Sequence, residues 1–203
     1  MRAELSKPKR AQRGVSMIEM LIVVFVMMIT AAMASPNIMQ AVYNIRLNSG
    51  ASDLAGLMQQ ARIMAAKNNT PYAIRYTNLG AVRIAFIDVN GDGVYNAAEP
   101  QVQFSGSVVP AAGAPSGGGG QPAAYVLVGD TGNGSFDNTT ILGFSPRGLP
   151  CDYSAPPTCA TPSVKPFNYY LTDTRMGLPG WASVVVTKAG RTKVVVWDGT
   201  SWH

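Results

Sequence analysis

The chain has 203 residues, which is enough for one membrane segment and one globular domain of ordinary size. Its net charge of +5 is misleading, because five of the 16 bases and one of the 11 acids lie in residues 1–14. Without those residues, 11 bases face 10 acids, a balance that argues against a large nucleic-acid footprint. The single histidine is the last residue, and no nucleophile motif or phosphate-binding loop appears, so we expect no enzyme.

Residues 1–14 form a short basic leader that ends at Gly14, and residues 15–36 are predicted to form a transmembrane helix. From Val15 to Ser35 the only charged side chain is that of Glu19. At about 1.5 Å per residue, these residues span roughly 30 Å, the thickness of the hydrocarbon core of a bilayer. Because positive residues stay on the cytoplasmic side, we expect the C-terminal part of the chain on the other side of the membrane.

Residues 37–70 are predicted to continue the same helix as an amphipathic segment. Pro36 lacks a backbone donor and is expected to bend the helix without ending it. Asn68, Asn69 and Pro71 form the stop signal. The apolar residues recur mostly at three- and four-residue intervals, which predicts one buried stripe along the helix. That stripe consists of Ile38, Val42, Ile45, Leu54, Leu57, Met58, Ala61 and Met64.

Residues 71–203 are predicted to form a β-rich domain, because the apolar period changes to two and β-branched and aromatic residues become frequent. The short links between strands indicate antiparallel sheets that pack on the helix, an α+β fold. The Gly-, Pro- and Ala-rich residues 105–124 are predicted to be a flexible loop. The predicted strands are Tyr72–Tyr76, Val82–Ile87, Val102–Phe104, Tyr125–Val128, Thr140–Phe144, Phe167–Leu171, Ala182–Lys188 and Arg191–Trp197.

Residues 88–99 fit the calcium-loop pattern D-x-[DN]-x-[DN]-G-x5-E without a mismatch. Calcium is therefore a candidate ion, although no cofactor is expected to be required. The alternative is an ion-free turn, because Asn-Gly-Asp-Gly at residues 90–93 also favours a hairpin and no helix is predicted before the loop. The candidate ligands are Asp88, Asn90, Asp92, Val94, Asn96 and Glu99.

The two cysteines, Cys151 and Cys159, both lie in the part of the chain expected outside the cytoplasm, where disulfides persist. The seven residues between them include two prolines and can close a tight loop. A disulfide and two free thiols are both compatible with the spacing. A zinc site is not indicated, because the spacing matches no zinc pattern.

The N-terminal residues resemble the class III signal of type IV prepilins and type II secretion pseudopilins. Gly14 matches the residue before the prepilin-peptidase cut, and Val15 would become the new, N-methylated N-terminus. Glu19 is the fifth residue after that cut, where the family keeps a glutamate, and Pro36 lies where many pilins kink the helix. The resemblance implies that Glu19 neutralises the N-terminal ammonium of a neighbouring subunit during assembly.

Two further stretches resemble the H-type (GspH/FimT) pseudopilins. They are Ile-Leu-Gly-Phe-Ser-Pro-Arg-Gly at residues 141–148 and Gly-Arg-Thr-Lys-Val at residues 190–194. The resemblance implies a minor pilin or pseudopilin, near the fibre tip, with a helix packed on a β domain. It also implies an inner-membrane protein with a periplasmic C-terminal domain. The implied partners are prepilin peptidase, other pilins and an inner-membrane assembly platform.

Two alternatives to a secretion or pilus subunit remain. Some H-type pilins that serve DNA uptake carry Gly-Arg-x-Arg in the last hairpin, where this chain has Gly-Arg-Thr-Lys at residues 190–193. The candidate nucleic-acid residues are Lys188, Arg191 and Lys193, and an ordinary solvated strand is the alternative. A DNA-binding minor pilin is therefore the second hypothesis. The third is a membrane-anchored periplasmic module outside any fibre, which predicts no processing by the peptidase.

Overall fold

The computed structural model describes residues 15–104, 106–111, 114–115, 140–153, 159, 166–175 and 180–203. Helix α1 runs from Met17 to Asn68, with Pro36 inside it, so the prediction that the helix continues past the proline is confirmed. The chain divides into two compact units, Met1–Met39 and Gln40–His203, which are described separately.

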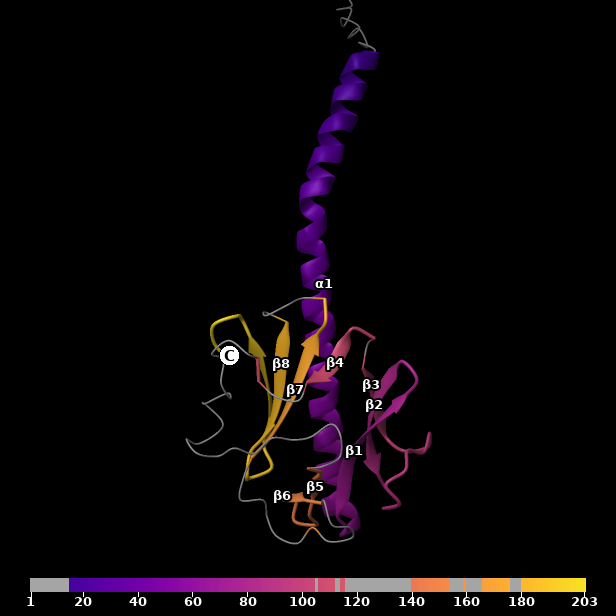
Figure 1. Cartoon of the computed structure of the whole chain (residues 1–203), viewed down its shortest axis with the longest axis vertical. Coiled ribbons are helices and arrows are strands. Elements are labelled where there is room, and N and C mark those ends of the chain that lie inside the picture. The colour runs from indigo at the N-terminus through magenta and orange to yellow at the C-terminus, as the bar shows by residue number, and fades with distance from the viewer. Residues whose placement is uncertain are drawn as a thin grey trace, which may run out of the picture. The chain divides into compact units, whose positions relative to one another are not determined.

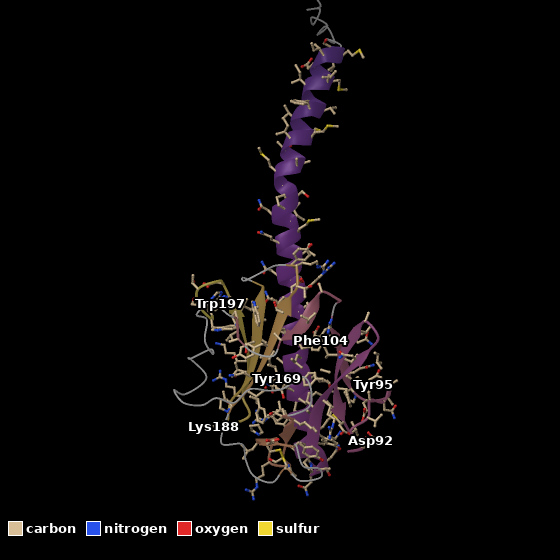
Figure 2. The ribbon with its side chains drawn as sticks, in the orientation of Figure 1. Asp92, Tyr95, Phe104, Tyr169, Lys188 and Trp197 are labelled. Atoms are coloured by element: carbon tan, nitrogen blue, oxygen red, sulfur yellow. A yellow bond between two sulfur atoms is a disulfide. The ribbon has the colours of Figure 1, made fainter. Side chains whose placement is uncertain are left out.

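The first unit contains the N-terminal part of α1, whose large apolar side chains are all exposed. Every large apolar residue from Met17 to Ile29 is at least 43% exposed, and Figure 2 shows side chains projecting from both sides of this part of the helix. Thr30 Oγ1 donates to the carbonyls of Val26 and Met27 at 3.1 and 3.0 Å, which satisfies its hydroxyl without water. A helix that is long enough and apolar on every side is typical of a membrane span.

The second unit contains the C-terminal part of α1 and two antiparallel sheets that lie on either side of it (Figure 1). The five-stranded sheet has the order β3-β2-β1-β5-β6, and the four-stranded sheet has the order β4-β7-β8-β9. The strands of the first sheet are β1 (Tyr72–Leu79), β2 (Val82–Asp88), β3 (Gln101–Phe104), β5 (Leu142–Phe144) and β6 (Pro150–Asp152). Those of the second are β4 (Val108–Ala111), β7 (Phe167–Asp173), β8 (Trp181–Val186) and β9 (Thr192–Trp197).

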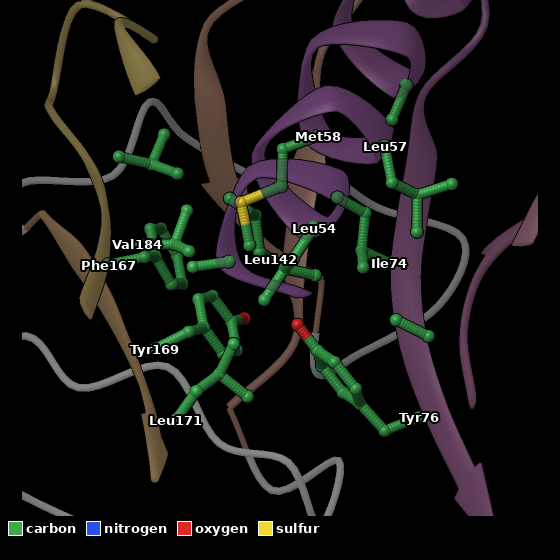
Figure 3. Close-up of a cluster of buried hydrophobic side chains, with 14 of the residues drawn as sticks. Leu54, Leu57, Met58, Ile74, Tyr76, Leu142, Phe167, Tyr169, Leu171 and Val184 are labelled. Carbon is green, nitrogen blue, oxygen red and sulfur yellow. The ribbon is translucent and has the colours of Figure 1, made fainter. Parts of the chain in front are cut away.

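The hydrophobic core lies between α1 and the two sheets. Leu54 and Met58 of the helix meet Ile74 of β1 and Val184 of β8 in one buried cluster (Figure 3). Tyr76 and Tyr169 come from different sheets, and their ring centroids are 5.5 Å apart in this core. The predicted fold class, a long N-terminal helix packed on antiparallel sheets, is confirmed.

The predicted buried stripe is correct only for its C-terminal part. Ile38, Val42 and Ile45 are exposed, and the burial of α1 begins at Leu47. The periodicity of the apolar residues therefore continues over a part of α1 that the sheets do not cover. The helical residues that are buried are Leu47, Gly50, Ala51, Leu54, Leu57, Met58, Ala61 and Ala65.

Two short strands were not predicted. Strand β4 lies inside residues 105–124, where a flexible loop was expected, and it pairs with β7 from Val108↔Asp173 to Ala111↔Tyr170. Strand β6 begins with a proline and pairs with β5. Strand β4 owes its structure to a partner about 60 residues later, which local composition does not reveal, whereas β6 forms a short hairpin with β5, the strand just before it. The predicted strand Tyr125–Val128 lies outside the described residues.

The outer face of the four-stranded sheet is covered in part by the end of the chain. His203 N donates to Val196 O and Val196 N donates to His203 O, at 3.1 and 2.9 Å. This pairing places the Trp202 ring 5.5 Å from that of Trp197 and 6.0 Å from that of Tyr170. The C-terminal residues are thus part of the folded sheet.

Candidate functional site

The first candidate site is the N-terminal turn of α1, which carries Glu19. The carbonyl of Ser16 accepts from the amides of Glu19 and Met20 at 3.0 and 3.2 Å and so starts the helix. Glu19 is in the first turn, where a carboxylate interacts favourably with the helix dipole. Within the described part of the chain, no base pairs with Glu19. Val15 is 64% exposed just before the helix, and Gly14 lies outside the described residues.

The charge of Glu19 is isolated along the helix as well. After Glu19 the next charged residue in the sequence is Arg46. Placing an acid in the hydrocarbon core costs up to about 3 kcal/mol, and less near the end of a span. Because no charged residue lies between Glu19 and Arg46, the carboxylate of Glu19 has no compensating base nearby on its own helix. Pro36 also lies in this exposed helix, where it does not end the hydrogen-bonded run.

The second candidate site is the loop between β2 and β3, which the structure brings together around Asp88. Asp88 Oδ1 accepts from Gly91 N at 2.8 Å, and Oδ2 accepts from Gly93 N at 3.0 Å and from Arg75 Nε at 2.8 Å. Asp92 Oδ1 accepts from Val94 N at 2.7 Å. Both glycines have positive φ, +75° and +74°, which explains why glycine occupies these positions.

Glu99 closes the same loop from its other end. Its Oε1 accepts from Val89 N at 2.9 Å, and its Oε2 accepts from Asn96 N at 3.0 Å. Asn90 donates to Asp92 Oδ2 at 2.7 Å, so most predicted calcium ligands bond to each other or to the backbone. The described residues contain no group of three acidic, His or Cys side chains arranged to hold a metal. These bonds are compatible with the ion-free alternative, in which the loop is a 12-residue connection between paired strands, and the calcium site stays a prediction.

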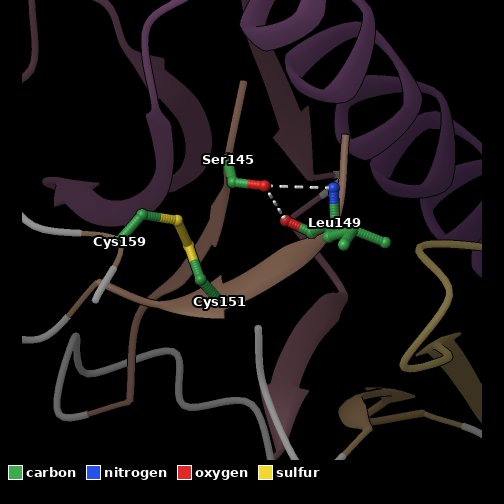
Figure 4. The surroundings of a disulfide bond; sticks show 4 residues. All are labelled: Ser145, Leu149, Cys151 and Cys159. Atoms are coloured by element: carbon green, nitrogen blue, oxygen red, sulfur yellow. Dashed lines mark hydrogen bonds between the residues drawn. A yellow bond between two sulfur atoms is a disulfide. The ribbon is translucent and has the colours of Figure 1, made fainter. Parts of the chain in front are cut away.

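The third feature is the disulfide between Cys151 and Cys159, which the structure contains (Figure 4). Cys151 is buried in β6, and the Cα atoms of the two cysteines are 5.5 Å apart. The sulfur of Cys151 packs on Gly143 of β5, where an added Cβ would lie 3.0 Å from it. The bond therefore ties the chain that follows β6 to the edge of the five-stranded sheet.

The fourth candidate site is the basic hairpin between β8 and β9. Lys188, Arg191 and Lys193 are all exposed, and Lys188 lies on the opposite side of the second unit from Asp92 (Figure 2). The alternation that places Arg191 and Lys193 on one face continues to Trp197, which is buried. The hairpin thus presents cations only near its turn, while the rest of that face belongs to the folded sheet.

Sequence reasoning missed the role of Arg62, which joins this hairpin to the turn after β5. Arg62 Nη1 donates to the carbonyl of Gly190 at 3.0 Å. A Cβ on Gly148 would lie 3.2 Å from Arg62 Nε, and one on Gly190 would lie 2.7 Å from the carbonyl oxygen of Gly148. The two glycine turns therefore touch each other beside the helix. Their glycines were visible in the sequence, but nothing in it indicated that they meet.

The turn after β5 is closed by Ser145. Its Oγ donates to Leu149 O at 3.1 Å and accepts from Leu149 N at 3.3 Å (Figure 4). Gly148 N donates to Ser145 O at 2.8 Å, and Gly148 has φ +72°. The exposed Arg147 lies in this turn, so its backbone is next to that of the hairpin with Arg191.

Comparison with known proteins identifies the N-terminal segment. Residues 9–35 match the profile of the prokaryotic N-terminal methylation motif. No curated protein matches the chain. Among solved structures, the crystal structure of the type IV minor pilin FimU of Pseudomonas aeruginosa strain PAO1 is similar. It has 17% identity and a TM-score of 0.44, and the alignment covers 73% of this chain and 87% of that chain.

The motif match covers Gly14, Val15 and Glu19, three of the four residues that the sequence singled out for processing and assembly, and it ends just before the fourth, Pro36. The chain therefore has a type IV pilin-like N-terminus with a methylation motif.

Proposed function

We propose that the protein is a minor pilin or pseudopilin of the H-type (GspH/FimT) group. In this proposal, prepilin peptidase cuts after Gly14 and Val15 becomes the methylated N-terminus. The subunit then enters a type IV pilus or a type II secretion pseudopilus, at or near its tip. The observation that carries the proposal is the single acid, Glu19, in an exposed apolar helix that bears the methylation motif.

The physical argument is that Glu19 is costly in a lone subunit and is compensated in a polymer. In the bilayer its carboxylate lacks a cation from its own helix, as described above. The ammonium of Val15 in a neighbouring subunit would supply one, and at low dielectric such a pair is strongly attractive. Pairing thus recovers the cost of burying the acid and favours entry into the fibre.

The same arrangement supports a proposed location and a set of proposed partners. Before assembly, the exposed apolar part of α1 would hold the protein in the bacterial inner membrane, with the second unit in the periplasm. The proposed partners are prepilin peptidase, other pilins or pseudopilins, and the inner-membrane assembly platform.

Glu19→Gln tests this function, because it keeps the shape of the side chain and removes its charge. We expect normal removal of residues 1–14, measured by N-terminal mass analysis of the membrane-extracted protein. We also expect at least a roughly tenfold loss from the sheared fibre fraction, since about 1.4 kcal/mol corresponds to a factor of ten. Asp53→Asn, an exposed acid in the second unit, is the matched control and should assemble normally.

Two results would contradict the proposal. One is a Glu19→Gln subunit that reaches the fibre at the wild-type level. The other is a native chain that still begins at Met1 in cells with an active prepilin peptidase, which would favour a membrane-anchored module outside any fibre.

A DNA-binding minor pilin is the second candidate function. It is favoured by the contact between the two glycine turns, which brings the backbone of Arg147 beside the hairpin of Lys188, Arg191 and Lys193. Replacing Arg191 and Lys193 by alanine should then abolish salt-dependent DNA binding, measured by fluorescence anisotropy at 50 and 200 mM salt. Equal binding by the wild type and this double variant would exclude the hairpin as the DNA site.

A further inference from the structure

We infer that Arg75 is the built-in cation of residues 88–99, a loop that has a calcium-binding sequence and folds without calcium. The acid positions of the calcium pattern are all present, so their negative charge needs a counterion. The structure provides one from β1, a strand outside the loop. The inference is independent of the proposed assembly function.

Arg75 reaches the first residue of the loop from the middle of β1. Its Nε lies 2.8 Å from Asp88 Oδ2, and the side chains of Arg75 and Asp88 are 11% and 0% exposed. The strand register accounts for this contact, because Ala73 of β1 pairs with Asp88 and Arg75 pairs with Phe86. Arg75 is therefore two residues along β1 from the partner of Asp88.

The guanidinium also lies against the sixth residue of the pattern. A Cβ built on Gly93 would come within 3.3 Å of Arg75 Cζ and within 3.5 Å of both Nη1 and Nη2. In a calcium loop this glycine makes the sharp turn around the ion. Here the same turn wraps the planar end of Arg75, so the positive charge contacts both the first and the sixth positions.

The remaining carboxylate oxygens accept bonds from backbone amides. Asp88 Oδ1 accepts from Gly91 N, and the two oxygens of Glu99 accept from Val89 N and Asn96 N. A calcium ion needs six to eight oxygen ligands whose lone pairs face it. A carboxylate oxygen has two lone pairs, and Asp88 Oδ2 uses both, because it accepts from Arg75 Nε and from Gly93 N. An ion that used this oxygen of the first position would therefore have to displace Arg75.

The consequence is a loop whose shape does not depend on the calcium concentration. A tethered guanidinium is present at every ion concentration, whereas the stabilisation by a bound ion vanishes when the ion concentration falls well below its Kd. Arg75 is thus a positioning residue that takes the place of a metal.

The test uses the full-length protein in detergent and follows tryptophan fluorescence during thermal unfolding. For the wild type we expect the same Tm in 5 mM CaCl2 and in EGTA. For Arg75→Gln we expect a Tm about 10 °C lower in EGTA, because Asp88 remains buried without its cation. Arg83→Gln is the control, since no acid pairs with Arg83 among the described residues.

A second measurement shows whether Arg75 occupies the place of an ion. Terbium(III) replaces calcium and emits when a nearby aromatic group is excited, and Tyr95 lies inside the loop. We expect no terbium emission from the wild type, clear emission from Arg75→Gln, and none from Arg75→Gln with Asp88→Asn. In Arg75→Gln, calcium should also recover most of the lost Tm.

Each outcome of these two measurements either supports or contradicts the inference about Arg75. A rise of the wild-type Tm with calcium, or terbium emission from the wild type, would overturn the inference. A folded Arg75→Gln that responds to neither ion would overturn it too, because Arg75 would then be an ordinary ion pair. If Arg75→Gln does not fold in EGTA, folding restored by calcium supports the inference, and no restoration contradicts it.

Discussion

Gly190→Ala should be among the most damaging single substitutions in the second unit. Gly190 lies in the β8–β9 turn at φ +75°, a region that costs an L-residue about 1–2 kcal/mol. The new Cβ would also lie 2.7 Å from the carbonyl oxygen of Gly148, a backbone atom that cannot rotate away. Overpacking of this kind adds about 1–3 kcal/mol, so the total loss of unfolding free energy should be about 2–5 kcal/mol.

Gly80→Ala is the matched control. Gly80 lies in the β1–β2 turn at φ +62°, and nothing lies within 4 Å of its added Cβ. It should therefore lose only the backbone cost of about 1–2 kcal/mol. The difference between the two variants isolates the contact between the two glycine turns.

The assay is urea unfolding of the full-length protein in detergent, followed by tryptophan fluorescence. All three tryptophans, at positions 181, 197 and 202, lie in or beside the four-stranded sheet that contains the β8–β9 turn. With a urea dependence of about 2 kcal/mol per M, the midpoint should fall by about 1–2.5 M for Gly190→Ala and by less than about 1 M for Gly80→Ala. Equal midpoints for the two variants would refute the steric argument.

Two other predictions concern the second unit. Replacing Cys151 and Cys159 by serine should lower the unfolding free energy by about 2.5 kcal/mol, the closure entropy of so short a loop, and dithiothreitol should then have no further effect on the urea midpoint. Burial raises the pKa of Tyr76 and Tyr169 well above the ordinary value and that of Tyr170 to about 12. Because the unfolded chain releases these protons first, stability should be full below pH 10 and fall above it by up to about 1.4 kcal/mol per pH unit for each group. Absorbance at 295 nm would contradict this if all tyrosines of the folded protein ionised together near pH 10.

Much of the fold could be predicted from the sequence because period and composition are local properties. The apolar run broken only by Glu19 predicted a long membrane-spanning helix, and β-branched runs such as residues 184–186 predicted strands. Strand β4 could not be predicted in this way, since its Val-Val-Pro-Ala sequence acquires its structure by pairing with β7, about 60 residues later.

The candidate sites show the same limit. The pattern from Asp88 to Glu99 predicted either a calcium loop or an ion-free turn, but it gave no sign of the Arg75 guanidinium, which bonds Asp88 from a neighbouring strand 13 residues upstream. Gly148 and Gly190 meet beside Arg62 of the helix, and no spacing in the sequence indicates this contact. The prediction of burial was wrong for Ile38, Val42 and Ile45, because periodicity identifies one face of a helix but does not show whether other elements cover that face.

The start of burial at Leu47 determines where the chain can be shortened. The Arg175 guanidinium lies 4.7 Å from the ring centroid of Tyr43, while Arg175 Nε is 3.7 Å from Asp173 Oδ1. A detergent-free version that begins at Gln40 would retain this cation–π contact as well as every helical residue of the core. A version that begins after Gly50 would instead remove the residue packed on Phe104 and Val108, and would expose apolar surface in water that favours aggregation.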